Sequence, residues 1–337
     1  MRSAERIGHD RLAEGGSILH VVITGGAGFV GSHLSEACLS RGWTVTAVDC
    51  FTDYYTTAVK RANVSWASAQ AGYRLVEADL AVDPIEPLLE GADLAFHLAA
   101  QPGVRASWGT RFDSYTTGNV VALQRMLEAA KSASLRKLVF ASSSSVYGDS
   151  EQLPTPESAR LAPLSPYGAT KVLGEHLCSI YQRSYDLPVV ALRYFSVYGP
   201  RQRPDMAFWK LIDAALHGTE MTIYGDGTQT RDFTYVADIV SATIAAAETA
   251  APGAVYNVGG GSRVALIDTI ELIAAEVGAR PRLQWTRHQR GDARDTAADT
   301  SRITRELGFA PAWDLAGGLA AQVAWQKRTV DLLVTSS

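Results

Sequence analysis

Apolar and polar positions along the chain form short, mostly apolar runs that alternate with stretches of helical spacing. The runs are rich in β-branched residues and have the length of strands. They cover residues 18–23, 43–49, 73–80, 94–100, 137–144 and 188–199. Residues 32–42 and 119–133 have helical spacing instead, and Gly42 is a helix stop signal. This alternation predicts βαβ units and a parallel sheet.

Strands such as 94–100 are apolar throughout, which predicts a sheet covered by helices on both faces. We therefore expect an α/β fold, a Rossmann-type doubly wound parallel sheet with a smaller C-terminal substrate-binding lobe. The expected divisions are a flexible leader at 1–18, a dinucleotide-binding domain at 19–192 and a lobe at 193–330. Residues 235–250 are strongly helical, so a segment around 234–262 is expected to return to the larger domain.

Composition narrows the class of protein without naming it. The 337 residues suit two lobes, and a hydrophobic content of 47% with 20% charged residues is ordinary for globular proteins. The net charge of −4 predicts no nucleic-acid partner, and no apolar run predicts a membrane helix. The N-terminus lacks the apolar stretch of a secretory signal. Three cysteines without metal-like spacing predict no disulfide framework and no metal site, and they favour the cytoplasm.

The segment TGGAGFVG, residues 24–31, joins the first predicted strand to the first predicted helix. Glycines allow a tight turn close to a pyrophosphate, and the helix start supplies oriented N–H groups. Asp49 ends the next strand, where its carboxylate can accept hydrogen bonds from both ribose hydroxyls and repel a 2′-phosphate. A glycine turn without a ligand is the alternative, but strand, loop, helix and acid occur in the expected order. The sequence thus predicts NAD rather than NADP.

Two further strand ends are expected to complete the dinucleotide crevice. Asp79 and Leu80 follow the third strand and are candidates for contact with the adenine. The fourth strand ends at residues 97–100, where His97 is expected to be a packed strand residue. The full set predicted for the cofactor is Gly25, Gly28, Phe29, Val30, Gly31, Asp49, Asp79, Leu80, Leu98, Ala99, Ala100, Tyr167, Lys171 and Tyr194.

Tyr167 and Lys171, in the segment SPYGATK, lie four residues apart at a predicted helix start and so share a helix face. This spacing is common by chance, and its position after a dinucleotide crevice makes it informative. A lysine ammonium and a positive nicotinamide ring both stabilise a phenolate. They lower the pKa of a tyrosine from about 10 toward that of a useful general base. A serine hydroxyl of SSSSVYG, residues 142–148, can then share the proton with a substrate oxygen.

These motifs resemble those of the extended short-chain dehydrogenases/reductases that act on nucleotide sugars, the NAD-dependent epimerases and dehydratases. They are most similar to those of UDP-glucuronic acid 4-epimerases. The resemblance extends from residue 21 to residue 309 and includes the segments GGAGFVG, HLAAQPGVR, SSSSVYG, SPYGATK, RYFSVYGPRQRPDM and YGDGTQTRDF. It implies a catalytic triad of Ser143, Tyr167 and Lys171. It also implies a homodimer formed through the helices that contain Leu123 and Tyr167.

The resemblance implies transient oxidation of the sugar at C4 to a 4-keto intermediate, with hydride return to the opposite face. In related sugar 4,6-dehydratases the segment matching the serines reads Thr-Asp-Glu, and related decarboxylases have a glutamate at the last position. Here these positions hold Ser144 and Ser145, so elimination has no evident agent. Hydroxyls can hydrogen-bond a substrate carboxylate, whereas a glutamate would repel it. A structural role at the strand end is the alternative, and it is the interpretation for Ser142.

Further substrate contacts follow from the resemblance by chemical group. Hydroxyls and one guanidinium would hold the carboxylate, two arginines would bind the phosphates, and another arginine would lie near the sugar. In that order they are Ser144, Ser145, Ser196 and Arg203, then Arg231 and Arg294, and finally Arg105, with Ser143 beside the reacting hydroxyl. The alternative for Arg203 is a solvated loop residue. Met206 and Phe208 belong either to a uracil pocket or to ordinary core packing.

We therefore predict NAD-dependent 4-epimerisation of UDP-glucuronate to UDP-galacturonate. The first alternative is a 4-epimerase of a neutral or N-acetylated UDP-hexose, against which Arg203 and the hydroxyl cluster argue. The second is a UDP-glucuronate decarboxylase or a dehydratase, against which the missing acids argue. The third is a non-enzymatic NAD-binding protein, which would not need the relay of Ser143, Tyr167 and Lys171.

Overall fold

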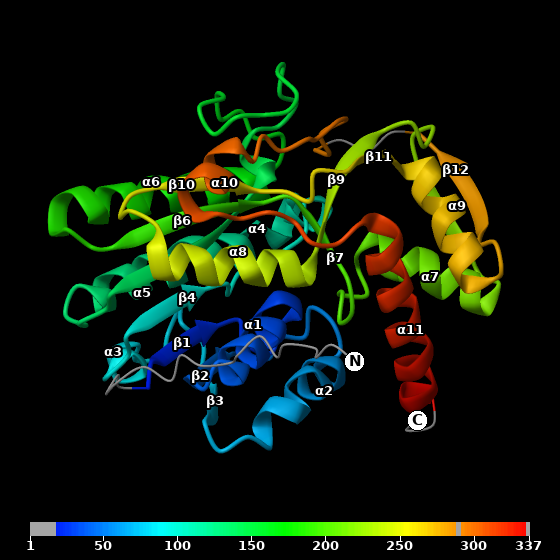
Figure 1. The fold of residues 1–337 in the computed structure, drawn as a ribbon. Helices are drawn as coiled ribbons and strands as arrows, with labels where there is room; N and C mark the ends of the chain where they lie inside the picture. Colours follow the sequence, from blue (N-terminus) through cyan, green and yellow to red (C-terminus); the bar gives the residue numbers. More distant parts are fainter. Residues whose placement is uncertain (1–17, 288–290, 335–337) are drawn as a thin grey trace, which may run out of the picture.

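The centre of the fold is a seven-stranded sheet in which all strands are parallel. The computed structural model describes residues 18–287 and 291–334, so residues 1–17 of the expected leader lie outside the described residues. The strand order is β10-β6-β5-β4-β1-β2-β3 (Figure 1). The strands are β1 (His20–Thr24), β2 (Thr44–Asp49), β3 (Tyr73–Glu77), β4 (Leu94–His97), β5 (Lys137–Ser143), β6 (Val189–Tyr194) and β10 (Val255–Val258). The predicted Rossmann-type α/β fold is confirmed.

Alternate residues of each strand pack into two separate cores, one on each face of the sheet. In β1, Val21 and Ile23 belong to one core and Val22 to the other, and all three are fully buried. Helices on the first face are α1 (Phe29–Ser40), α8 (Val236–Thr249) and α10 (Ser301–Leu307), and α2 (Thr57–Ser68) packs beside α1. Those on the second are α3 (Glu86–Leu89), α5 (Ala122–Ala130) and α6 (Pro166–Tyr185). Coverage of both faces explains why the strands are apolar throughout.

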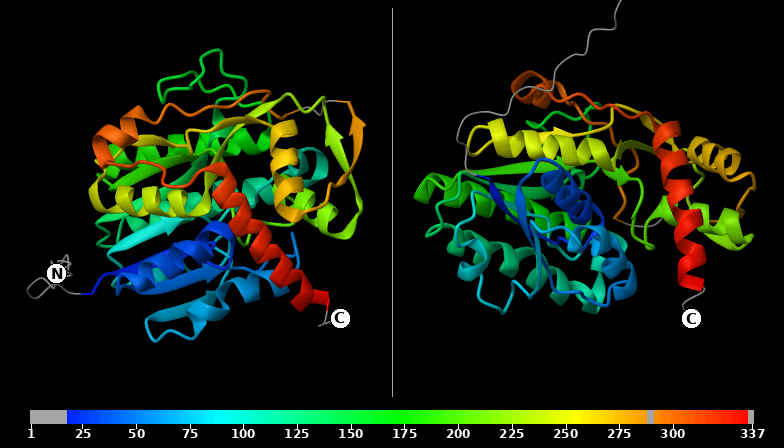
Figure 2. Two further views of the ribbon diagram at one scale, coloured as in Figure 1. Left: turned by 45° about the vertical axis from the view of Figure 1, so that its right-hand side comes forward. Right: turned by 60° about the horizontal axis from the view of Figure 1, so that its bottom comes forward.

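Most of the chain after β6 forms a smaller lobe beside the main sheet (Figure 1). Its strands make two small sheets, β11-β9-β7 and β12-β8. The bounds are β7 (Ser196–Tyr198), β8 (Glu220–Tyr224), β9 (Thr230–Tyr235), β11 (Arg263–Ala265), β12 (Arg282–Thr286), α7 (Ala207–His217), α9 (Leu266–Val277) and α11 (Leu315–Val334). Both views of Figure 2 keep α11, in red, beside this lobe, where it packs on α7 and α9. Within the described ranges, no helix is long and apolar enough to cross a bilayer.

Two elements of the later sequence lie in the larger lobe. Strand β10 pairs with β6 at the edge of the main sheet, and α8 packs on β5 and β6. Both fall in the segment around 234–262 that was expected to return there. The chain therefore crosses between the lobes more than once, and the two lobes share several connections (Figure 1).

The helix expected at residues 119–133 starts earlier and is irregular. The short turns η1 (Arg105–Ser107), η2 (Gly109–Arg111) and α4 (Phe112–Tyr115) lead into a π-helical turn, η3 (Thr116–Val121), which precedes α5. In η3, the Asn119 amide accepts a hydrogen bond from the Gln101 N–H at 2.6 Å and donates to the Thr170 hydroxyl at 3.0 Å. Asn119 thus joins the loop after β4 to α6. Such turns are frequent at functional sites, and hydrophobic spacing does not show them.

A buried ion pair connects α6 to β6. Two nitrogens of Arg193 donate to the Glu175 carboxylate at 2.9 and 2.6 Å, and these side chains are 6% and 7% exposed. The third nitrogen donates to the Tyr147 hydroxyl at 2.7 Å. Ser142 of β5 donates to the same carboxylate at 2.5 Å, so this serine has a structural partner. The network fastens the strand end that carries the remaining serines to the helix that carries Tyr167.

The substitution Glu175→Ala should destabilise the protein strongly, because it leaves the Arg193 guanidinium buried without a counter-charge. Removal of one partner of a buried ion pair costs about 3–5 kcal/mol. Denaturant unfolding followed by circular dichroism should show a clearly lowered midpoint. Glu77→Ala is the matched control, because the exposed Arg61–Glu77 pair contributes only about 0–1 kcal/mol. Equal midpoints for the two variants would contradict this account.

Candidate active site

The carboxyl ends of the parallel strands open into a cleft of about 1190 Å³. Ligands of open α/β sheets bind at this edge. One wall consists of strand ends and loops of the main sheet, and the other includes Arg203, residues 205–207 and strand β8 of the smaller lobe. A site for a single drug-sized ligand has about 300–1,000 Å³. The cleft is therefore large enough for a dinucleotide together with a second ligand.

The glycine loop before α1 brings backbone against backbone. Gly25 has a φ of +69°, in the left-handed region, and a Cβ at this position would lie 2.9 Å from the Ala99 nitrogen. A Cβ at Gly31 would overlap the carbonyl oxygen of Gly25. Gly28 caps α1 and offers no side chain to its first N–H groups. This glycine cradle at a helix start fits the pyrophosphate of a dinucleotide.

Asp49, at the end of β2, is 8% exposed and already has three donors. Its Oδ2 accepts the N–H of Ala27 at 3.2 Å, and its Oδ1 accepts the N–H of Phe51 at 2.8 Å and the Nζ of Lys60 at 3.3 Å. A carboxylate has about four acceptor positions. About one position is left, so Asp49 fits one ribose hydroxyl better than the two that the sequence analysis predicted. Lys60, which sequence reasoning missed, offsets part of its charge.

The remaining residues predicted for the cofactor also line the cleft. They are Gly25, Gly28, Phe29, Val30, Gly31, Asp79, Leu80, Leu98, Ala99, Ala100 and Tyr194. His97 is different, because its side chain is 1% exposed and its Nδ1 is 3.0 Å from the Thr24 hydroxyl. Burial lowers the pKa of His97 to about 3, so it is neutral at physiological pH. It is a packed strand residue, as its position in an apolar run predicted.

Ser143, Tyr167 and Lys171 meet in the cleft, where β5 ends and α6 begins. The Lys171 side chain is buried, its Nζ donates to the Ala141 carbonyl at 2.8 Å, and it lies 5.9 Å from the centre of the Tyr167 ring. The Ser143 oxygen accepts the N–H of Ser145 at 3.1 Å. Its own O–H therefore remains available to Tyr167 or to a substrate oxygen.

The described residues by themselves do not lower the pKa of Tyr167. Burial raises it, and hydrogen bonding with Ser143 and the positive charge of Arg203 only oppose that shift. Burial also lowers the pKa of Lys171 to about 8, so this lysine still carries its proton at pH 7 for most of the time. Lowering the pKa of Tyr167 to that of a general base thus requires more positive charge than the described residues supply.

Six of the residues predicted for the substrate line the cleft beyond Ser143. They are Arg105, Ser144, Ser145, Ser196, Arg203 and Met206. Arg105 pairs with Asp292 at 2.7 Å and lies over the Tyr224 ring at 4.3 Å, so it is not a free cation. Phe208 is 1% exposed and packs in the core of the smaller lobe. The core alternative therefore holds for Phe208, and its assignment to a uracil pocket is withdrawn.

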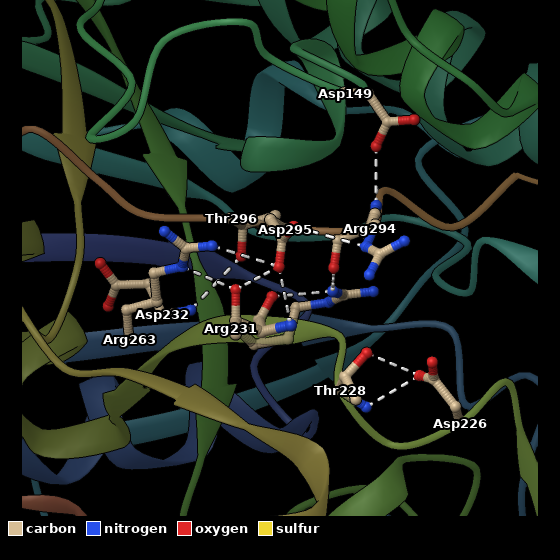
Figure 3. A network of polar contacts seen from close by, with 10 residues as sticks. Asp149, Asp226, Thr228, Arg231, Asp232, Arg263, Arg294, Asp295 and Thr296 are labelled. Atoms are coloured by element: carbon tan, nitrogen blue, oxygen red, sulfur yellow. Dashed lines mark hydrogen bonds and ion pairs between the residues drawn. The ribbon is translucent and has the colours of Figure 1, made fainter.

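Arg231 and Arg294 belong to a polar cluster and are not among the residues that line the cleft. Figure 3 shows them with several aspartates, and Arg231 donates to the carbonyls of Thr230 and Arg294 at 2.9 and 2.8 Å. The Arg294 side chain is 70% exposed, and its backbone N–H donates to Asp149 at 2.7 Å. Their assignment to the phosphates stays a prediction.

The loop of residues 199–206, which carries Arg203, is held from both lobes. From α1, the His33 Nε2 lies 2.9 Å from the Pro200 carbonyl, and Glu36 pairs with Arg201 at 2.6 Å. From α11, the Gln322 side chain accepts the N–H of residue 199 at 2.9 Å. Tyr54 and Asp205 form another contact of this loop and were missed, because no sequence motif joins residues so far apart. The loop is therefore a fixed part of the cleft wall.

Comparison with known proteins identifies the family of this chain. Residues 21–259 match the model of the NAD dependent epimerase/dehydratase family. The chain belongs to this family. An uncharacterized UDP-glucose epimerase YtcB of Bacillus subtilis is 41% identical over 91% of the chain and 98% of its own length. A probable UDP-glucuronate 4-epimerase of Rhizobium meliloti is 34% identical over 91% of the chain and 96% of its own length.

A solved structure of this epimerase family has the same fold. It is the UDP-glucuronic acid 4-epimerase of Bacillus cereus in complex with UDP-glucuronic acid and NAD, with a TM-score of 0.90 and 39% identity. The similarity covers 92% of this chain and all of that one. NAD is therefore the cofactor of this family. The glycine cradle and Asp49 are the parts of this chain that fit it.

For a member of this family, Tyr167→Phe should abolish most turnover, because it removes the group that we expect to exchange the substrate proton. General acid–base catalysis contributes about 10²–10⁴-fold, so turnover of UDP-sugars should fall by at least that range. NAD in the purified protein, measured after heat release, should be unchanged. Tyr73→Phe is the control, because it removes a buried hydroxyl that has no partner among the described residues. Near wild-type turnover of the Tyr167 variant would exclude this tyrosine as the base.

Proposed function

We propose that this protein is an NAD-dependent 4-epimerase that interconverts UDP-glucuronate and UDP-galacturonate. One observation carries the choice of sugar. The cleft wall around Tyr167 supplies the hydroxyls of residues 143–145 and the guanidinium of Arg203, and no carboxylate stands at positions 144 and 145. The name of the Rhizobium meliloti relative and the ligands of the Bacillus cereus structure support the same substrate.

The chain's own part in the reaction is acid–base and positional. Tyr167 takes the proton of the sugar 4-hydroxyl, and the Ser143 hydroxyl donates a hydrogen bond to the same oxygen. Bound NAD supplies reversible oxidation and reduction at C4, and its oxidised ring adds the positive charge that favours the phenolate. Lys171, protonated near pH 7, contributes to the same effect. The 4-keto sugar must then turn within the cleft so that C4 is reduced on its other face.

A hexuronate makes one further demand on the protein. The 4-keto form of glucuronate is a β-keto acid, in which the C5–C6 bond can break, its electron pair moving toward the C4 carbonyl as CO₂ leaves. This loss is fastest when the breaking bond is parallel to the carbonyl π-system. Arg203 and the hydroxyls of Ser144, Ser145 and Ser196 are the groups of the cleft that can hold the carboxylate away from that alignment. Restraint of the carboxylate thereby keeps the product a hexuronate.

Epimerisation of a neutral UDP-hexose is the second candidate. Arg203 is already paired with Asp205, which reduces the net positive charge available to a substrate carboxylate. The Bacillus subtilis relative is named as a UDP-glucose epimerase. A substrate assay separates the two candidates, since a neutral intermediate has no carboxylate to lose. A decarboxylase is disfavoured because Ser144 and Ser145 offer no acid.

A homodimer is part of the proposal. Helices α5 and α6 pack side by side on the second face of the sheet, and together with η3 they expose large apolar side chains. These are Val121, Leu173, Ile180 and Tyr185, which are 43%, 44%, 47% and 56% exposed. Leu123 itself is fully buried in the protein's own core. A second copy of this face would cover the exposed residues as a four-helix contact.

The proposed compartment is the cytoplasm. Cys38 and Cys178 are buried thiols, Cys50 is exposed, and none of the three is paired within the described part of the chain. Burial raises the pKa of each thiol. Unpaired, protonated cysteines suit a reducing compartment.

Incubation of the wild-type protein with UDP-glucuronate should give UDP-galacturonate, with few pentose products, when followed by NMR of the anomeric protons. Arg203→Ala should lower the total rate and raise the ratio of pentose to galacturonate. A loss of about 1.4 kcal/mol of restraint changes this ratio about tenfold. Ser144→Ala should act in the same direction, with a smaller effect. A wild type that instead interconverts UDP-glucose and UDP-galactose alone would overturn the choice of substrate.

Sedimentation velocity at micromolar concentration should show a dimer of the wild-type protein. Ile180→Asp should shift it toward monomer, because the substitution would place a charge in an apolar contact. Trp66→Asp is the matched control, since Trp66 is also exposed but lies on α2. Monomeric wild type at these concentrations would exclude the proposed dimer.

A further inference from the structure

The guanidinium of Arg203 is held along one edge. Its Nε and Nη2 donate to the two oxygens of Asp205 at 2.9 and 3.1 Å, and the side chains are 19% and 30% exposed. A guanidinium has five N–H groups, which form a side edge at Nε and an end edge at the two Nη atoms. Asp205 occupies the side edge. No other described side chain or carbonyl bonds to this guanidinium, so both N–H groups of the end edge remain for a ligand.

Tyr54 holds Asp205 from another part of the cleft. Its hydroxyl donates to Oδ2 of Asp205 at 3.2 Å, although the two residues are 151 positions apart in sequence. Burial and the neighbouring Asp205 carboxylate raise the pKa of Tyr54, so its hydroxyl stays protonated and acts as a donor. A Cβ at Gly103 would lie 2.6 Å from this hydroxyl, which shows how closely the loop after β4 confines it. Tyr54, Asp205 and Arg203 all line the cleft.

These contacts have two opposite effects on an anionic sugar. The negative charge of Asp205 offsets that of Arg203 and weakens attraction of a second carboxylate. The two-point contact, in contrast, fixes the plane of the guanidinium and therefore the direction from which a carboxylate can bind it. Arg203 lines the same cleft as Tyr167, and its positive charge favours the Tyr167 phenolate.

We propose that Asp205, supported by Tyr54, is a positioning residue that determines how the substrate carboxylate is held during epimerisation. It directs the end edge of Arg203 toward the sugar, at the expense of affinity for the anion. The proposal rests on the proposed function, because a neutral sugar has no carboxylate to position. It assigns roles to two residues that act through Arg203 and not on the reacting atoms.

The substitution Asp205→Asn separates orientation from affinity. It removes the negative charge and the two-point pair with little change in size, since the Asn amide faces Arg203 with a donor. The KM for UDP-glucuronate should therefore fall, by roughly threefold, while the ratio of pentose to galacturonate should rise about tenfold. A merely structural role would raise KM and leave the product ratio as it is. The NAD content of the purified variant and its thermal midpoint report whether the fold is retained.

A second variant keeps the test decisive if Asp205→Asn does not fold. Tyr54→Phe removes only the hydroxyl that holds Asp205, so the product ratio should rise about threefold with KM unchanged. Tyr73→Phe is again the matched control and should keep the wild-type ratio.

The outcomes distinguish this inference from the proposed function. Conversion of UDP-glucuronate by the wild type, with the same KM and product ratio in both variants, would overturn the role of Asp205 and Tyr54 alone. A raised KM with an unchanged ratio would also overturn it. Failure of the wild type to convert UDP-glucuronate would overturn both proposals.

Discussion

The strands of the main sheet all run in one direction, and the rest of the molecule depends on this constraint. Their carboxyl ends meet at one edge, so the glycine loop after β1, Asp49 at the end of β2 and Ser143 at the end of β5 face the same cleft. Residues widely separated in sequence become neighbours there because of the strand direction, and no specific contact between each pair is needed. The helices on both faces exclude water from the strands, which leaves this edge as the natural place for chemistry.

Local patterns in the sequence were sufficient for this part of the protein. The glycine spacing reflects close backbone approach, which only a side chain of a single hydrogen permits, and so it is visible without a structure. Tyr167 and Lys171 share a helix face because of the helical repeat itself. Six of the seven strands were recognised from apolar runs. Strand β10 was anticipated only as part of a returning segment.

What escaped the sequence depends on contacts between distant residues. Asn119, in a π-helical turn, bonds to the loop after β4, and Lys60 pairs with Asp49 from α2, which packs on α1 and β3. Phe208 follows a loop that lines the cleft, yet the helical repeat turns its side chain into the core. The pKa of Tyr167 shifted upward because burial, which no motif records, outweighs the nearby positive charges. The residue types at the site were therefore predictable from the sequence, whereas the effect of burial on their pKa values was not.

The loop of residues 199–206 has a consequence for how substrate specificity can evolve in this family. It contacts α1 through His33 and Glu36 and α11 through Gln322. Its conformation therefore depends on α1 and α11 as well as on the loop sequence. A relative that acquired only a new loop sequence would lose these anchors along with the old specificity. Divergence in this family should therefore proceed through coordinated replacements in the first helix, the loop and the last helix. Recombination that exchanges single segments would yield hybrids in which the loop of residues 199–206 has lost some of these contacts.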